Sequence, residues 1–262
     1  MSIFNRVISP VLALVALPIL LIGAWWIYTL NSTSFFVPEP VGLVETFIST
    51  WITGERLTAD VLPSLRRLGM GLALAIVLGI LLGLLIGLNR TVRALTEPVF
   101  EFFRALPPPV LIPVLMLLIG VGNTMQVAVI VSGCIWPILL NTIEGVRGID
   151  PVQSETSRSY GISGFSRVRY QILPAAAPPI MAGVRQSLSI ALILMVISEM
   201  FATSSGLGFT IVQFQRSFAI PEMWSGIAVL GIIGVTLSFI FQFVERRVLR
   251  WYHGLKEVEN AA

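Results

Sequence analysis

Hydrophobic residues in this chain gather into long windows with few or no charged side chains, and polar segments separate the windows. A helix that crosses a membrane needs about 20 consecutive apolar residues, and these windows reach that length. Four of them predict one span each: 10–30, 68–88, 179–200 and 223–244. The charge-free segment 105–143 is long enough for two more, with G-V-G-N-T at 120–124 as the turn between them. The pattern therefore predicts six transmembrane helices.

The first window is interpreted as a retained helix and not as a cleaved signal peptide. Residues 7–38 contain no charge, whereas the apolar core of a signal peptide has about 7–15 residues. The window also ends in W-W-I-Y, and aromatic side chains are typical of the membrane–water interface.

Basic residues set the predicted orientation, because cytoplasmic loops of membrane proteins carry an excess of Lys and Arg. With the N-terminus inside, the cytoplasmic segments hold 13 of the 17 basic residues. The four that remain outside are Arg56, Arg66, Arg67 and Arg216. We therefore expect both termini and the polar segment 150–174 to be cytoplasmic.

Composition favours a single membrane-embedded unit. Of the 262 residues, 55% are hydrophobic and 12% are charged, and the mean hydropathy is +0.88. Ordinary soluble domains carry about 25% charged residues. No basic run is interleaved with aromatic side chains as a nucleic-acid surface requires. The single Cys134 excludes an internal disulfide, and the single His253 gives no basis for a metal site. We interpret 1–262 as one all-α transmembrane domain with its core at 60–250.

The longest polar interruption, 150–174, predicts two short helices around a glycine. Asp150 suits an N-cap and Pro151 the first helical position. Gly161 supplies the left-handed residue that ends the first helix. Ser163 can cap a second helix, which we expect to end near Pro174, because a residue before proline avoids the α region. We call this helix–Gly–helix segment the knob.

The knob resembles the E-A-A-x-x-x-G-x₉-I-x-L-P loop of permease subunits from bacterial ATP-binding-cassette importers. The residues in register with that loop are Glu155, Gly161, Leu173 and Pro174. Thr156 and Ser157 depart from it by replacing two alanines, and Gln171 stands at the isoleucine position. Three weaker motifs resemble the nitrate/sulfonate/taurine branch of these permeases. They are F-R-A-L-P-P-P at 103–109, S-G-L-G-F at 205–209 and W-Y-H-G at 251–254.

The resemblance, which covers about residues 60 to 255, implies a function and a set of partners. It implies the permease subunit of an importer in a bacterial inner membrane, with two ATP-binding subunits, a second permease copy (a homodimer) and an external solute-binding protein. The cargo would be a nitrate-, sulfonate-, taurine- or bicarbonate-like anion or a small organic compound. A Walker A motif needs G-x-x-x-x-G-K-[ST], and the only lysine, Lys256, follows G-L. ATP and Mg²⁺ would therefore be bound by the partner and not by this chain.

Apolar side chains in the knob distinguish a docking element from a solvated loop. A solvated loop has no need of exposed Phe and Ile, whereas a helix that docks in a partner's groove does. By resemblance, Glu155 makes an ionic contact with the ATPase. The residues assigned to this coupling are Glu155, Tyr160, Gly161, Phe165, Val168, Leu173 and Pro174.

Glu199 is the strongest ionisable candidate inside a span. Such groups are functional by default, but Glu199 has two further interpretations: it lies in interfacial water, or it pairs with Arg66 or Arg67 at the same depth. We favour the ion pair, because a bare carboxylate would repel an anionic substrate.

Small polar residues in the fourth and fifth spans are candidates for the translocation path. Helix–helix packing explains such residues equally well. They are Ser132, Cys134, Asn141, Ser187, Ser189 and Ser198, and Glu199 joins them as a second choice to its pairing.

Glycines and prolines predict two further features. Gly79, Gly83 and Gly87 recur every fourth residue, a ridge that permits close approach of another helix. The prolines at 107–109 favour a kink in the third span, although a loop that enters the membrane late fits nearly as well.

Two other functional classes fit less well. An ion- or proton-coupled secondary carrier commonly shows inverted repeats and buried charges at the midplane, and the sequence shows neither. A membrane-embedded enzyme would need clustered Asp, His or Glu side chains.

Overall fold

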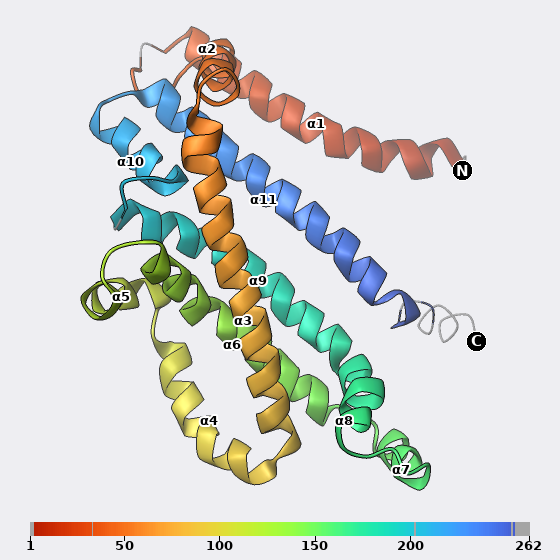
Figure 1. The fold of residues 1–262 in the computed structure, drawn as a ribbon. Coiled ribbons are helices and arrows are strands. Elements are labelled where there is room, and N and C mark those ends of the chain that lie inside the picture. Colours follow the sequence, from red (N-terminus) through yellow and green to blue (C-terminus); the bar gives the residue numbers. More distant parts are fainter. Residues whose placement is uncertain (1–2, 33, 202, 253, 255–262) are drawn as a thin grey trace.

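The computed structural model describes residues 3–32, 34–201, 203–252 and 254, with side chains from Ala16 onward. All regular structure in this part of the chain is helical, as expected (Figure 1). The helices are α1 (Ile3–Leu30), α2 (Pro40–Phe47), α3 (Leu62–Leu88), α4 (Arg90–Ala105), α5 (Leu111–Ile119), α6 (Asn123–Arg147), α7 (Pro151–Ser159), α8 (Gly164–Arg167), α9 (Leu173–Phe201), α10 (Leu207–Arg216) and α11 (Ile220–Val248). Three π-helical turns lie between them, at Ile48–Ile52, Leu57–Val61 and Val168–Ile172, and a 3₁₀ turn spans Pro108–Val110.

Four described helical stretches are long and apolar enough to cross a membrane: Leu57–Leu88, α6, Gly164–Phe201 and α11. A fifth candidate is the pair formed by α4 and Pro108–Ile119, bent by 80°. In α1, the apolar part with described side chains is Ala16–Leu30. Figure 1 shows α1 beginning and α11 ending on the same side of the molecule, away from α2 and α10.

The prediction of two spans within 105–143 needs a correction. α5 has only nine residues, about 14 Å of helix, which is too short for a hydrocarbon core of about 30 Å. The chain instead reaches α5 through α4, whose charged residues concealed it. The helix is interrupted at the prolines: Leu106 and Pro107 each precede a proline and have ψ 122°, because α backbone is disfavoured there.

The knob's second helix does not end near Pro174, contrary to the prediction. α8, the π turn and α9 form one continuous helix of 38 residues, Gly164–Phe201. Leu173 keeps helical backbone and donates its N–H to the carbonyl of Val168. A π turn widens the helix by one residue per turn. The wider turn relieves the clash that a proline ring otherwise makes with the carbonyl four residues before it.

The core lies where α3, α6 and α9 cross, and the glycine ridge of α3 packs directly against α6. A Cβ on Gly79 would lie 2.8 Å from Cγ2 of Ile138, and one on Gly83 would lie 2.5 Å from Cβ of Thr142. Such distances exclude any side chain at these positions without a shift of α6. The packing role predicted for this ridge is confirmed.

A second cluster lies around Trp51, between α10, α11 and the first π turn. The Trp51 indole is 1% exposed and donates from Nε1 to Ser225 Oγ at 2.9 Å. An indole N–H that is buried needs such an acceptor. This cluster therefore joins α11 to the π turn Ile48–Ile52.

Candidate coupling site and translocation path

The first helix of the knob is capped at both ends. Asp150 Oδ1 accepts a hydrogen bond from the Val152 N–H at 2.8 Å. Gly161 has φ +70°, and its N–H donates to Arg158 O at 2.9 Å while the Ile162 N–H donates to Ser157 O at 3.0 Å. This pair of bonds is the Schellman motif that a left-handed glycine permits. The predicted N-cap and glycine stop are both confirmed.

The start of the second helix differs in detail from the prediction. Ser163 has the extended backbone of an N-cap, but its side chain makes no capping hydrogen bond. Gly164 has φ +57°, a conformation that strains any residue with a Cβ. Two glycines, and not one, therefore set the angle between the two helices of the knob.

Gln171, where the sequence departs from the importer loop, connects the two helices of the knob. Its side chain is 6% exposed. Gln171 Oε1 accepts from Arg167 Nε at 3.2 Å, and its Nε2 donates to Ser154 Oγ at 3.4 Å. An isoleucine could make neither bond, so in this chain polar contacts of Gln171 hold the second helix of the knob to α7.

The predicted docking side chains fall into two groups. Tyr160 and Phe165 are 80% and 77% exposed, and Glu155, Gly161 and Pro174 are also exposed. Val168 and Leu173 are partly buried against the core of this chain. Sequence reasoning missed two exposed apolar side chains of the knob, Val152 at 68% and Tyr170 at 70%. Spacing alone did not show which face α8 turns outward.

At the opposite end of α9, Glu199 forms the predicted ion pair, and its partner is Arg67. Arg67 Nη1 lies 2.7 Å from Glu199 Oε1. The side chains of Arg67 and Glu199 are 7% and 0% exposed. Arg66 is exposed. A buried charge pair thus joins α9, the fifth predicted span, to α3, the second predicted span.

Hydrogen bonds satisfy the remaining oxygen lone pairs of Glu199. Ser64 Oγ lies 2.8 Å from both carboxylate oxygens, and the Gly208 N–H donates to Oε2 at 3.0 Å. Ser64 Oγ in turn accepts from the Leu207 N–H at 2.9 Å. A buried charge is tolerated when it is paired and hydrogen-bonded in this way.

The S-G-L-G-F motif at 205–209 is the loop that encloses this carboxylate. Gly206 has φ +118°, and a Cβ there would lie 2.5 Å from the Glu199 carboxyl carbon. A Cβ on Gly208 would lie 2.4 Å from Val196 O. The Gly206 N–H donates to Asp60 Oδ1 at 3.2 Å, and Asp60 pairs with Arg56 at 3.1 Å. Sequence reasoning missed the roles of Ser64 and Asp60, although the two glycines of the motif were a signal for close backbone approach.

Arg67 has further partners that fix its guanidinium. Its Nε donates to Asn123 Oδ1 at 2.8 Å, and its Nη1 and Nη2 donate to Ser205 O at 2.9 Å and Ser205 Oγ at 3.0 Å. These contacts connect α3, the start of α6 and the loop before α10. All three elements are therefore held around one charge pair.

The small polar residues proposed for the translocation path have different environments. Ser187 is fully buried; its Oγ donates to Cys134 O at 2.7 Å, and Cys134 Sγ donates to Ser187 O at 3.3 Å. Ser198, also 0% exposed, donates to Met195 O. The two bonds between Ser187 and Cys134 join α9 to α6, and the Ser198 bond lies within α9. Asn141 is half-buried and donates to Pro137 O at 2.8 Å.

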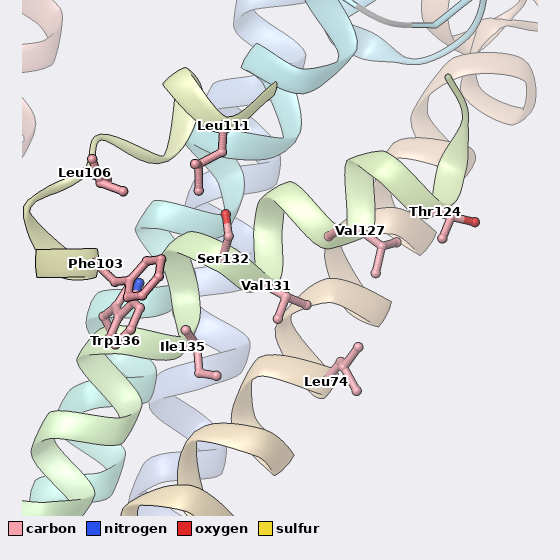
Figure 2. A pocket seen from close by; sticks show the side chains of 11 residues that line it. Leu74, Phe103, Leu106, Leu111, Thr124, Val127, Val131, Ser132, Ile135 and Trp136 are labelled. Carbon is pink, nitrogen blue, oxygen red and sulfur yellow. The ribbon is translucent and has the colours of Figure 1, made fainter. Parts of the chain in front are cut away.

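Two of the predicted path residues line hollows in the described structure: Ser189 lines a pocket between α9 and α11, and Ser132 lines a cavity at α6. The cavity has about 500 Å³, and it lies between α3, α4, α5 and α6 (Figure 2). Figure 2 shows Phe103 and Trp136 together on one side of it and Leu74 on the other, and the two aromatic rings stack at 6.3 Å. Thr124 is the other hydroxyl on a wall that is otherwise apolar.

Comparison with known proteins places this architecture in a family. The family model of the binding-protein-dependent transport system inner membrane component matches residues 75–253. The chain is 32% identical over 246 residues to SsuC of Escherichia coli K12, a permease protein assigned to aliphatic sulfonates. The aligned region covers 92% of this chain and 93% of SsuC. The chain is 29% identical over 240 residues to the taurine transport system permease protein TauC of the same organism, which covers 88% and 86% of the two chains.

A solved structure has the same fold. An inward-facing conformation of the MetNI methionine ABC transporter superposes with a TM-score of 0.62 at 20% identity, over 72% of this chain and 94% of that one. The family model spans the knob and the S-G-L-G-F loop, which both lie within residues 75–253. The chain therefore belongs to the inner membrane component family of binding-protein-dependent transport systems.

Proposed function

We propose that this chain forms the solute pathway of an importer that a separate ATPase drives through the knob. The ATPase would comprise two ATP-binding subunits that hold ATP and Mg²⁺, and a second copy of this chain would complete the pathway. An external binding protein would deliver the solute. Family membership supports the permease role, and the predicted orientation puts the knob and both termini in the cytoplasm of a bacterium.

The observation that carries this proposal is the exposed aromatic surface of a rigid knob. Tyr160, Phe165 and Tyr170 are each at least 70% exposed, although large aromatic side chains are otherwise worth burying. The knob's helices are fixed by two caps and by the Gln171 hydrogen bonds. A rigid element with aromatic anchors is what a partner's groove recognises.

The continuous helix that leaves the knob gives a direct route for movement. Gly164–Phe201 has 38 residues, about 57 Å at 1.5 Å per residue. Phe165 stands at one end of it and Glu199 at the other. A displacement of the knob by the ATPase would therefore move the loop around Glu199, on the face where an external binding protein would dock.

A co-purification experiment tests this function. The chain is co-expressed with the ATP-binding subunit of its importer, identified by its Walker A motif and by photolabelling with azido-ATP. Phe165→Ala should weaken the association by about 2 kcal/mol, close to 30-fold, as expected for an aromatic anchor. Phe36→Ala is the matched control, because Phe36 is 62% exposed and lies outside the knob. Equal retention of the ATPase by both variants would contradict the proposal.

A further inference from the structure

A second cavity of about 460 Å³ lies between α3 and α6, next to the charge pair of Arg67 and Glu199. Its lining residues are Pro63, Arg66, Arg67, Met70, Asn123, Val127 and Ser205. No acidic side chain is among them. The cavity lies near the start of α3 and of α6, which the predicted topology places on the outer side.

The charges around this cavity leave one positive charge unbalanced. Glu199 neutralises Arg67 at 2.7 Å, and Arg56 neutralises Asp60 at 3.1 Å. Arg66 has no ion pair or hydrogen bond within the described part of the chain. The cavity wall thus carries a net charge of +1, on the guanidinium of Arg66. The planar fork of a guanidinium matches the geometry of an oxyanion.

Arg67 also orients the other polar groups of the cavity. Asn123 Oδ1 accepts from Arg67 Nε, and Ser205 Oγ accepts from Arg67 Nη2. Because its oxygen faces Arg67, Asn123 turns its Nδ2 donors the other way, and no described acceptor binds them. An anion at Arg66 would find these amide hydrogens as further donors.

The interior beyond the cavity is apolar. Val127 lines both this cavity and the larger one of Figure 2. Arg66, Met70 and Leu74 follow at intervals of four along α3, so they share one helix face. That face passes from a charged end at Arg66 to the apolar walls around Leu74 and Val131. A solute with a charged head and an apolar tail fits this gradient, whereas a small inorganic anion gains nothing from the apolar part.

We propose that the Arg66 cavity binds the head group of a small organic anion, a sulfonate or carboxylate with a short apolar tail, while its tail enters the cavity of Figure 2. This inference rests on the proposed function, because it assigns the solute class of the same pathway. The anionic head is held by Arg66 and the Asn123 amide. The pair of Arg67 and Glu199 is a positioning element that does not touch the solute.

Direct binding to the full chain tests this site. The chain is placed in phosphatidylcholine nanodiscs without the ATPase, and radiolabelled butane-1-sulfonate is titrated at constant ionic strength. We expect saturable binding, tighter than that of methanesulfonate or inorganic sulfate. Arg66→Gln should raise the dissociation constant at least tenfold and Arg66→Lys by less, because it keeps the charge. The control Arg216→Gln, another exposed arginine, should leave it unchanged.

Three outcomes would overturn the site. They are equal binding by the wild type and Arg66→Gln, binding of inorganic sulfate as tight as that of butane-1-sulfonate, and complete displacement by phosphatidylglycerol nanodiscs. The last would show that a lipid phosphate, and not a solute, is the oxyanion at Arg66. The assay contains no ATPase, so failure here leaves the coupling function intact, and failure of the co-purification experiment leaves this site intact.

Discussion

Replacement of Glu199 by Gln isolates the energetic contribution of the buried charge pair. The substitution keeps the shape of the side chain but removes the counter-charge of Arg67, which is 7% exposed as a side chain. Oε1 of Glu199 accepts hydrogen bonds from Arg67 and Ser64, and Oε2 accepts from Gly208 and Ser64. The substitution replaces one of these two oxygens by an amide NH₂. A donor would then face donors whichever way the amide turns.

The expected cost follows from this geometry. Loss of one partner of a buried pair costs about 3–5 kcal/mol, because the other charge is left uncompensated. For a chain of this size, each kcal/mol lowers the midpoint of thermal unfolding by roughly 2–4 °C, so Glu199→Gln should lower it on the order of 10 °C. Tryptophan fluorescence of the purified chain in an uncharged detergent measures the midpoint.

Double variants identify the partner. Arg67→Met combined with Glu199→Gln removes both charges and should recover part of the lost stability, because no buried charge then remains unpaired. Arg66→Met combined with Glu199→Gln is the matched control and should recover nothing, because Arg66 is exposed. Recovery with Arg66→Met, or with neither arginine variant, would refute the assignment of the pair.

Three further predictions use single substitutions. Gly83→Ala should destabilise the chain by about 1–3 kcal/mol through overpacking, whereas Gly69→Ala, with open space around its Cβ, should be neutral in the same thermal assay. Gly161→Val should abolish ATPase binding while the protein still inserts, and Gly161→Asn, which tolerates positive φ, should retain it; equal pull-down by both would count against the knob geometry. In a cysteine-free background, Ser217→Cys should react with an impermeant maleimide from outside and Ser166→Cys only from inside, and the reverse labelling would invert the topology.

The ends of helices in the knob were predictable because local chemistry decides them. Asp150 and Gly161 act on backbone groups within a few residues, so their roles follow from neighbouring positions. Pro174 misled the prediction because a π turn, Val168–Ile172, relieves the clash of its ring. A π turn has no sequence signature comparable to that of a helix cap, so the residues around Val168–Ile172 did not predict it.

The third span was misplaced because charge was used as the sign of a loop. α4 carries charged residues along its whole length, and its apolar side chains Val92, Phe100 and Phe103 pack against other helices. A window test for uncharged residues cannot detect such an amphipathic helix. Only the structure shows that α4 contributes Phe103 to the wall of the cavity in Figure 2.

The sequence predicted that Glu199 forms an ion pair with an arginine of α3, but it did not predict which arginine. Arg66 and Arg67 are adjacent in sequence, and successive residues on a helix point about 100° apart, so only one of them can face α9. Which one does so depends on the rotation of α3, set by the contacts of its glycine ridge with α6. The contributions of Ser64, Asn123 and Ser205 depend on the same tertiary contacts, and no local pattern reports them.

Site-specific cross-linking from the knob tests the central claim most directly. Phe165→Cys carries a benzophenone label, the complex with the ATP-binding subunit is irradiated in nanodiscs, and the cross-linked product is identified by mass spectrometry. The account predicts a covalent adduct of this chain with the ATP-binding subunit, at a yield that changes when ATP is added, and no such adduct from the control Phe36→Cys. An equal yield from both positions, or no adduct from Phe165→Cys in a complex that hydrolyses ATP, would contradict the claim that the ATPase docks on the knob.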